Sequence, residues 1–183
     1  LDTPPLVIDV DDVLAPGGEL LGEMEYEDLL ASGDADFHWQ LPADEWQAIA
    51  LGYTSGTTGN PKGVVTHHRG AYLNAVSNTL AWNMGAHPVY LWTLPMFHCN
   101  GWCFPWAVTA VGGTHVMLRA IDPARMIELI HSEKVTHLNG APTVLLMLAE
   151  APEAQGIHFD PPIRVATGGS PPSPTLLGRL EEL

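Results

Sequence analysis

Positive charge is scarce in this chain of 183 residues, which has 7 Lys and Arg against 21 Asp and Glu and a net charge of −14. The first Lys or Arg is Lys62, so residues 1–50 contain none. Nucleic-acid binding depends on a positive field at the protein surface. The composition therefore excludes a general nucleic-acid-binding surface, and a polyanion such as ATP would need a local site with a divalent cation.

Cysteines and long apolar runs are also scarce. Cys99 and Cys103 are the only cysteines, too few for a disulfide framework and typical of a reducing compartment. No apolar run reaches the ~18–20 residues of a membrane-spanning helix. Residues 1–5 do not show the basic and then apolar pattern of a secretory signal. We therefore expect a cytoplasmic protein without a transmembrane segment.

Both ends of the sequence read as interrupted. The chain opens with Leu1 and stops at Leu183 within a helical pattern that has no Gly or Asn cap. We expect a single partial domain over residues 1–183, with an acidic lead-in at 1–45 and a binding core at 46–183. Uncovered leucines on the last helix would favour self-association, hence a possible homo-oligomer; they are Leu176, Leu177 and Leu180.

Strand-like and helix-like segments alternate along the chain. The pattern predicts strands at 6–10, 48–53, 63–66, 89–92, 114–118, 135–138 and 163–166, and helices at 26–31, 68–80, 102–111 and 142–149, with two more that begin after the caps Asp122 and Ser173. The strands at 48–53 and 163–166 read as buried. Such alternation indicates an α/β fold, with a largely parallel sheet and flanking helices.

The segment 53–64, Tyr-Thr-Ser-Gly-Thr-Thr-Gly-Asn-Pro-Lys-Gly-Val, has the composition of a phosphate-binding loop. Its glycines allow close backbone approach to an anion, its hydroxyls can donate to phosphate oxygens, and its lysine adds a positive charge. The order around Lys62 fits neither a Walker A loop nor a Rossmann fingerprint. We predict that ATP is bound by Thr54, Ser55, Gly56, Thr57, Thr58, Gly59, Asn60, Pro61 and Lys62.

Two further segments follow predicted strands. His98 lies at a strand-to-helix junction, where an imidazole can change charge near neutral pH. A zinc site made of His98 and the two cysteines would lack a second pair of ligands, whereas core packing remains open for Phe104 and Trp106. The second segment, 167–171, follows the carboxyl end of a predicted strand, the edge where open α/β sheets bind ligands.

Segment 53–64 resembles the signature loop of the adenylate-forming (ANL) superfamily, which includes acyl-CoA synthetases, luciferase-like enzymes and peptide-synthetase adenylation domains. The resemblance continues through 67–70, 94–102 and 167–171. Segment 97–103, Phe-His-Cys-Asn-Gly-Trp-Cys, is most similar to CoA ligases of medium-chain fatty acids or 3-methylmercaptopropionate. The chain is thereby identified as a fragment of the large N-terminal domain of such an enzyme.

The resemblance implies substrates and site residues. It implies a ligase that converts a carboxylic acid, expected to be a fatty acid, and ATP into an acyl-adenylate and then transfers the acyl group to CoA. His98 and Lys62 would be catalytic, with His98 beside the carboxylate and Trp102 as a wall of the acid pocket. Thr54 would hold Mg²⁺, and the adenosine would lie against Gly169, Ser170 and Pro171.

Other family motifs are not found in the sequence: the second magnesium ligand, the ribose-binding Asp and the C-terminal domain with its catalytic Lys. We therefore expect the chain to be inactive by itself. Two alternatives remain open. One is a non-catalytic nucleotide-binding or interaction module, and the other is an adenylating enzyme without CoA transfer.

Overall fold

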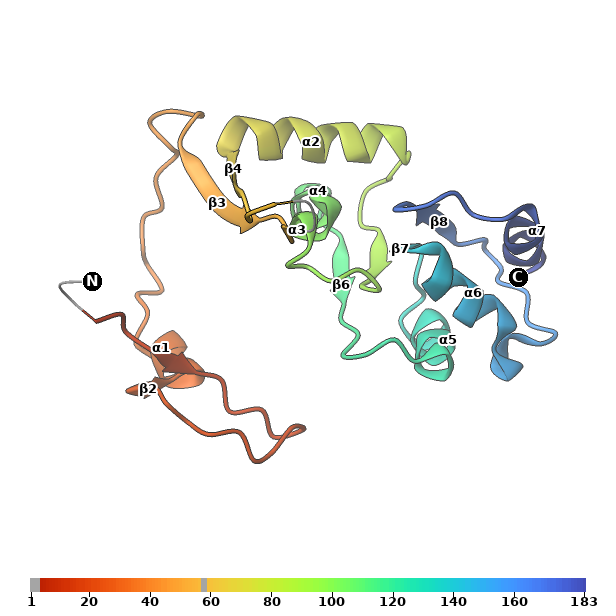
Figure 1. The fold of residues 1–183 in the computed structure, drawn as a ribbon, viewed down its shortest axis with the longest axis horizontal. Helices are drawn as coiled ribbons and strands as arrows, with labels where there is room; N and C mark the ends of the chain where they lie inside the picture. Colours follow the sequence, from red (N-terminus) through yellow and green to blue (C-terminus); the bar gives the residue numbers. More distant parts are fainter. Residues whose placement is uncertain (1–3, 57–58) are drawn as a thin grey trace. The chain divides into compact units, whose positions relative to one another are not determined.

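The computed structural model describes residues 4–56 and 59–183, so the predicted ligands Thr57 and Thr58 lie outside the described residues. The chain divides into two compact units, Leu1–Leu41 and Pro42–Leu183. Figure 1 shows the fold coloured along the sequence.

The first unit has very little regular structure. A two-residue parallel bridge joins β1 (Ile8–Asp9) to β2 (Met24–Glu25), and α1 (Tyr26–Ala31) follows at the predicted position. The Asp9 carboxylate accepts hydrogen bonds from the backbone N–H groups of Leu21 and Gly22. No residue among 4–41 is buried, so local hydrogen bonds rather than an apolar core organise this unit.

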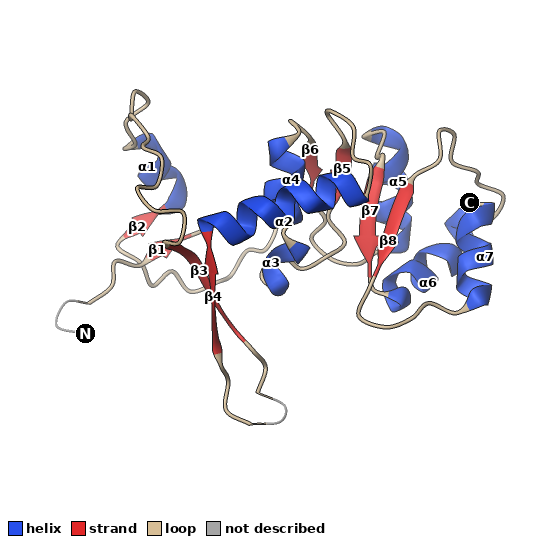
Figure 2. Cartoon of the chain, turned by 90° about the horizontal axis from the view of Figure 1, so that it is seen from above, coloured by secondary structure: helices blue, strands red, loops and turns tan. Residues whose placement is uncertain are grey.

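The second unit is built on a four-stranded sheet in the order β6–β5–β7–β8, in which all neighbouring strands are parallel. Figure 2 shows the four strands side by side. Their bounds are β5 (Val89–Leu91), β6 (Thr114–Val116), β7 (His137–Gly140) and β8 (Arg164–Thr167). The predicted α/β fold with a parallel sheet is confirmed. Strands β5 and β6 are shorter than the sequence pattern indicated, and β7 and β8 have the predicted length but begin two residues and one residue later.

The helices of this unit begin at the residues that their sequences favour. They are α2 (His68–Ala81), α3 (Cys99–Trp102), α4 (Phe104–Ala110), α5 (Pro123–Ser132), α6 (Pro142–Glu150) and α7 (Pro174–Glu182), with a short 3₁₀ helix η1 (Pro152–Ala154). The Asp122 carboxylate accepts from backbone N–H groups at the start of α5, and the Ser173 hydroxyl does the same for α7. Both predicted caps are confirmed.

Helices cover both faces of the sheet, with one apolar cluster on each. One cluster packs Leu91 and Leu138 against α5, α6 and α7. The other packs Tyr90 and Trp92 against α2 and α4. Since successive side chains of a strand point to opposite faces, adjacent residues such as Tyr90 and Leu91 enter different clusters. The carboxyl edge of the sheet is thereby held between two packed layers.

The prediction of a buried strand at 48–53 was wrong. Strand β3 (Ala48–Tyr53) pairs only with β4 (Gly63–His67), as an antiparallel hairpin. Five of its six residues are exposed, because neither a helix nor another strand of the described residues covers this two-stranded ribbon.

The continuous helix predicted over 102–111 was also wrong. Residues 99–103 all have positive φ, between 49° and 63°, so α3 is a left-handed turn. The right-handed helix α4 begins only at Phe104, with Pro105 in its first turn. The predicted lack of cover on the last helix holds for Leu177, which is exposed. It was wrong for the other two leucines, because Leu176 is buried and Leu180 packs against the same cluster. The prediction of a homo-oligomer stays untested.

None of the helices in the described ranges 4–56 and 59–183 combines the length and the apolar character that crossing a bilayer requires.

Candidate active site

A cavity of about 690 Å³ lies where three parallel strands of the sheet end. The segments that follow these three strands all line the cavity. They contribute Leu94, Pro95 and His98 after β5, Ala141 after β7, and Gly168 and Gly169 after β8. Along the chain, β6 is added on one side of β5 and β7 on its other side, so the direction in which strands are added reverses between β5 and β7. Such reversals at the carboxyl edge are the usual ligand sites of open α/β sheets, and the volume suits a small molecule.

His98 lies at the rim of this cavity and is exposed. Its backbone N–H donates to the carbonyl of Pro95, which closes a turn directly after β5. Its Nε2 atom is 3.8 Å from the sulfur of Cys99. The imidazole is therefore accessible from solvent at the edge of the cavity.

Trp102 forms a wall of the cavity beside Gly168. A Cβ atom at Gly168 would lie 2.8 Å from Cη2 and 3.2 Å from Cζ2 of the Trp102 indole. The ring therefore lies directly against the backbone that follows β8. This contact joins the two predicted segments 98–102 and 168–169, which are about 70 residues apart in the sequence, in one site.

Gly101 explains how Trp102 comes so close. It has a φ of 57°, and a Cβ there would lie 2.8 Å from the Trp92 ring. Any other residue would have to displace that buried indole. Gly101 therefore lets the left-handed turn lie against the core. This position brings Trp102 to the carboxyl edge of the sheet.

The predicted phosphate loop joins β3 to β4 and is closed by two contacts between its ends. The Thr54 N–H donates to the Lys62 carbonyl, and the Lys62 N–H donates to Thr54 Oγ1, both over 3.0 Å. Gly56 has a φ of 69°, and a Cβ there would lie 2.7 Å from the Gly59 carbonyl. The backbone is thus turned back on itself, as an anion-binding loop requires.

Thr54 fits a role at a cation only in part. Its hydroxyl oxygen accepts from Lys62 and keeps one free lone pair, and the residue is exposed. One neutral oxygen is a weak ligand for Mg²⁺, which prefers several oxygens with carboxylates among them. Among the described residues, no group of three or more His, Cys, Asp and Glu side chains is placed to hold a metal ion.

The structure brings together some of the predicted site residues and not others. His98, Trp102 and Gly169 line one cavity, whereas Ser170, Pro171 and the described residues of loop 54–62 do not line it. A hydrogen bond of 3.3 Å from Asn100 Nδ2 to Thr66 Oγ1 connects the turn after β5 to strand β4, which leaves the phosphate loop. This contact ties the hairpin to the rim of the cavity.

Sequence reasoning missed several residues of the lining. Ala141 was missed although it directly follows β7, as Gly168 directly follows β8. Its place after a strand of a parallel sheet was a signal that could have found it. The others come from the helices that cover the edge, and no local pattern marked them: they are Asn78, Trp82 and Phe104. Cys103 lies nearby, half-buried, and burial together with the neighbouring Cys99 raises the pKa of its thiol.

Three polar side chains are buried beneath the cavity, on the sheet face that packs against α2 and α4. Tyr90 is fully buried, and burial raises the pKa of its phenol strongly. Asn139 and His137 follow on β7 and are buried as well.

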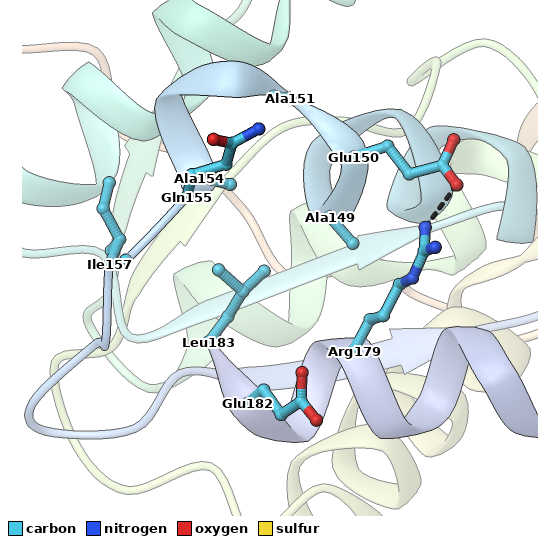
Figure 3. Close-up of a pocket in the computed structure, with 10 residues that line it drawn as sticks. Ala149, Glu150, Ala151, Ala154, Gln155, Ile157, Arg179, Glu182 and Leu183 are labelled. Atoms are coloured by element: carbon cyan, nitrogen blue, oxygen red, sulfur yellow. Dashed lines mark hydrogen bonds and ion pairs between the residues drawn. The ribbon is translucent and has the colours of Figure 1, made fainter.

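A second cavity, of about 680 Å³, lies between α6, η1 and α7. Figure 3 shows the ion pair between Glu150 and Arg179 at its rim. Both side chains are about half exposed, so the pair contributes little to stability. This cavity contains none of the predicted site residues, and the cavity at the sheet edge remains the candidate active site.

Comparison with known proteins supports the same family along nearly the whole chain. The sequence profile of AMP-binding enzymes matches residues 5–183. The peroxisomal acetate/butyrate–CoA ligase of Arabidopsis thaliana is 54% identical over 157 residues, which are 85% of this chain and 28% of that protein. The 2-methylpropanoate–CoA ligase of Humulus lupulus is 43% identical over 183 residues, or 98% of this chain and 33% of that protein.

The peroxisomal trans-cinnamate:CoA ligase of Petunia hybrida is 44% identical over 181 residues, which are 98% of this chain and 32% of that protein. The chain thus spans about a third of the length of these curated relatives.

Solved structures agree with the fold. The inhibitor-bound N-terminal domain of FACL13 from Mycobacterium tuberculosis superimposes with a TM-score of 0.78 at 26% identity, covering 86% of this chain and 40% of that one. The o-succinylbenzoate CoA synthetase of Bacillus subtilis, in complex with ATP and magnesium ion, gives a TM-score of 0.71 at 26% identity and covers 88% of this chain and 34% of that one.

Proposed function

Because the chain belongs to the AMP-binding enzyme family, we propose that it forms part of the N-terminal domain of an acid–CoA ligase. The whole enzyme would consume ATP, a carboxylic acid and CoA, and would release AMP, pyrophosphate and an acyl-CoA. A second magnesium ligand from a further family motif, and a C-terminal domain that supplies the catalytic lysine, belong to this proposal.

One observation carries the assignment of the site: His98, Trp102 and Gly169 line a single cavity at the carboxyl edge of the sheet. In the proposed arrangement the acid enters with its apolar part against Trp102 and its carboxylate towards His98. Gly169, followed by Ser170 and Pro171, borders the adenosine. The cavity is lined on its other side by apolar residues such as Trp82, Leu94 and Phe104, which favours an apolar acyl group over a charged one.

The loop at 54–62 is proposed to hold the β- and γ-phosphates. Its support is the folded-back backbone at Gly56, which leaves no space for a side chain, together with the exposed hydroxyls of Thr54 and Ser55 and the exposed side chain of Lys62. Mg²⁺ would neutralise phosphate charge in the complex, and Thr54 would offer it one oxygen, with other ligands required. Lys62 would add the positive charge that the acidic chain otherwise lacks near this loop.

The chemistry needs both sites at once. The carboxylate oxygen attacks the α-phosphorus of ATP, the bond from that phosphorus to the bridging oxygen breaks, and pyrophosphate leaves with its electron pair. The two reactants are anions and repel each other, so the protein must fix their positions and offset charge. In the second step the CoA thiol attacks the acyl carbon, and AMP leaves. His98 is proposed to sit beside the reacting carboxylate in the first step.

The names of the relatives give the range of acids to test. They act, by name, on acetate and butyrate, on 2-methylpropanoate and on trans-cinnamate. A fatty acid of medium length, as segment 97–103 suggested, stays a proposal within this range. The indole of Trp102 against Gly168 closes one side of the cavity, which favours short or compact acyl groups over long ones.

The decisive experiment is product analysis with the full-length protein, Mg-ATP and a series of acids from acetate to octanoate, with trans-cinnamate added. The expected products are AMP and pyrophosphate in equal amounts, with an acyl-CoA when CoA is present. Formation of ADP and phosphate would contradict the proposal. Pyrophosphate release that is unaffected by CoA would favour an adenylating enzyme without CoA transfer, and no reaction with any acid would favour a non-catalytic module.

The cellular compartment is a separate question. A cytoplasmic location was expected from the two cysteines, whereas two of the relatives above are peroxisomal by name. We propose that peroxisomal and cytoplasmic locations be compared directly by imaging of the tagged full-length protein, since the described residues decide neither.

A further inference from the structure

We propose that Asn78 is a positioning residue, whose side-chain amide clamps the left-handed turn 99–103 and so holds Trp102 against Gly168. The inference rests on the proposed function for its effect on the acid substrate. Its structural part, the clamp itself, can be tested without any activity.

The turn needs support from outside because its backbone is strained. Five consecutive residues have positive φ, and four of them carry side chains: Cys99, Asn100, Trp102 and Cys103. A left-handed conformation costs an L-residue about 1–2 kcal/mol, so the four together cost several times that. Strain of this kind persists only where the surroundings impose the conformation, and it is concentrated at functional sites.

The hydrogen bonds within the turn leave the Trp102 carbonyl without a partner. Gly101 N–H donates to the His98 carbonyl and Cys103 N–H donates to the Asn100 carbonyl, both over 3.0 Å. Neither bond fixes the peptide group that follows the indole of Trp102. This peptide lies within the left-handed turn, directly after Trp102, so a hydrogen bond to it from outside helps to hold the turn that carries the indole.

Asn78 supplies the missing bond from helix α2. Its Nδ2 donates to the Trp102 carbonyl over 2.9 Å, and also to Asn74 Oδ1 over 3.1 Å. An amide nitrogen has two protons, so both bonds can form at once. Asn78 is half-buried, where a hydrogen bond is less weakened by water than at the surface. The hydrogen bond from Asn100 to Thr66, which also joins the turn to a distant element, is longer at 3.3 Å.

Asn78 also lines the cavity itself, together with Trp102 and Gly168. Loss of the amide would release the Trp102 peptide and let the indole leave the glycine backbone, which changes the wall that the acid meets. The phosphate loop should not be affected, because none of its described residues lines this cavity. Gly169, which is proposed to border the adenosine, lines the cavity beside Gly168, so the inference predicts a larger change in KM for the acid than in KM for ATP.

The test compares two substitutions in the full-length protein. Asn78→Leu keeps the approximate size and removes both donors, and Asn78→Asp puts an acceptor opposite the Trp102 carbonyl. Each should raise KM for the preferred acid about three- to tenfold, the equivalent of one hydrogen bond, and leave KM for ATP within about twofold. Asn74→Ala is the matched control. It removes the Asn74 oxygen that accepts the second hydrogen bond from Asn78, and it should leave both KM values at the wild-type value.

Amide hydrogen exchange gives the readout that does not depend on activity. The peptide containing residues 98–104 should exchange faster in Asn78→Leu than in the wild type, whereas the peptide containing β3 should be unchanged, with melting temperature and far-ultraviolet circular dichroism confirming that the variant folds. Unchanged exchange at 98–104 in both Asn78 variants would overturn the clamp. Equal increases in KM for acid and ATP would overturn its selective effect on the acid.

The two proposals fail in different ways. If the wild type forms no acyl-CoA from any acid but exchange at 98–104 is faster in Asn78→Leu, the proposed function is wrong and the clamp is supported. If the wild type is an active ligase and both readouts are unchanged in folded Asn78 variants, the clamp is wrong and the function stands.

Discussion

The indole of Trp102 lies against the backbone of Gly168, so closely that a Cβ atom at Gly168 would be 2.8 Å from Cη2 of the ring. Both residues line the cavity, and they come from different exits of the sheet, one after β5 and the other after β8. Their contact closes the cavity on this side.

The first prediction concerns Gly168→Ala. The added methyl group must displace the Trp102 ring, because 2.8 Å is shorter than carbon atoms tolerate. Overpacking of this kind costs about 1–3 kcal/mol, so we expect a lower melting temperature and a changed KM for acid. Gly169→Ala is a poor control because its φ is 88°, whereas Gly178→Ala on α7 has open space and should leave the melting temperature unchanged or raise it. A wild-type melting temperature and KM in Gly168→Ala would mean that the ring moves away freely.

The second prediction concerns Trp102 itself in the full-length protein. Trp102→Ala should widen the cavity and shift the preference towards longer acids, and Trp102→Phe should shift it less, in proportion to the volume removed. Truncation of a packed Trp costs about 3–5 kcal/mol of stability, so unfolding must be measured beside the ratio of kcat/KM for butyrate and octanoate. An equal loss for both acids in a folded variant would contradict a role in selectivity.

Lys62 carries the third prediction. A charge-assisted contact to phosphate contributes about 1.5–3 kcal/mol, so Lys62→Ala should raise KM for ATP about 10- to 100-fold while KM for the acid changes little. Lys134→Ala is the matched control, because this exposed lysine lies after α5 and outside the cavity at the sheet edge. If both constants and kcat stay at wild-type values in Lys62→Ala, the lysine points into solvent and takes no part.

The features that the sequence predicted correctly are those with local causes. Asp122 and Ser173 cap their helices through bonds to residues two or three positions away, and a pattern of this length is visible in the sequence. The parallel sheet follows similarly from alternating apolar strands and helices. Gly56, one of the loop glycines, marked a position where the backbone turns closely on itself.

The features that were missed depend on distant contacts. The helix predicted over 102–111 is interrupted at Cys103 because of two distant contacts. Gly101 packs against Trp92, and the Asn78 side chain donates a hydrogen bond to the Trp102 carbonyl, 24 residues away. No local preference of Cys or Trp predicts a left-handed backbone. Strand β3 is apolar, so it read as buried, but its exposure depends on what lies beside it rather than on its own residues. The joining of segments 98–102 and 168–169 also needed the strand order, which a sequence without a fold does not give.

The fourth prediction concerns the pH dependence of stability. Burial, and then the charge of Arg164, lower the pKa of His137 below its ordinary value of 6.5. The unfolded chain therefore takes up the proton more readily than the folded one, so the contribution to stability is complete above about pH 6.5 and is lost as the pH falls below it. His115 shares this direction, because burial lowers its pKa.

The free energy of unfolding in urea, measured between about pH 7.5 and pH 5, should fall less steeply for His137→Gln than for the wild type, by up to about 1.4 kcal/mol per pH unit for one proton. His38→Gln replaces an exposed histidine in the first unit and serves as the control. Parallel curves for the wild type and His137→Gln would show that His137 stays unprotonated, or protonates equally, in both states.

The last prediction concerns the 183 residues expressed by themselves: they should bind Mg-ATP weakly and form no acyl-adenylate. The described residues of loop 54–62 are exposed or half-buried, and the hairpin that carries them pairs only with itself. A ligand there would bury little surface, whereas tight small-molecule sites enclose most of the surface of their ligands.

The net charge of −14 opposes a polyanion, and salt screens that repulsion only beyond about 8 Å. Thr54 offers one oxygen to the cation, already engaged with Lys62. Isothermal titration with Mg-ATP should therefore give a dissociation constant above about 100 μM, a binding free energy weaker than about −5.5 kcal/mol, and Lys62→Ala should weaken it further. Binding in the low micromolar range, or pyrophosphate release on addition of butyrate, would show that the hairpin and the sheet-edge cavity already form a working site within these residues.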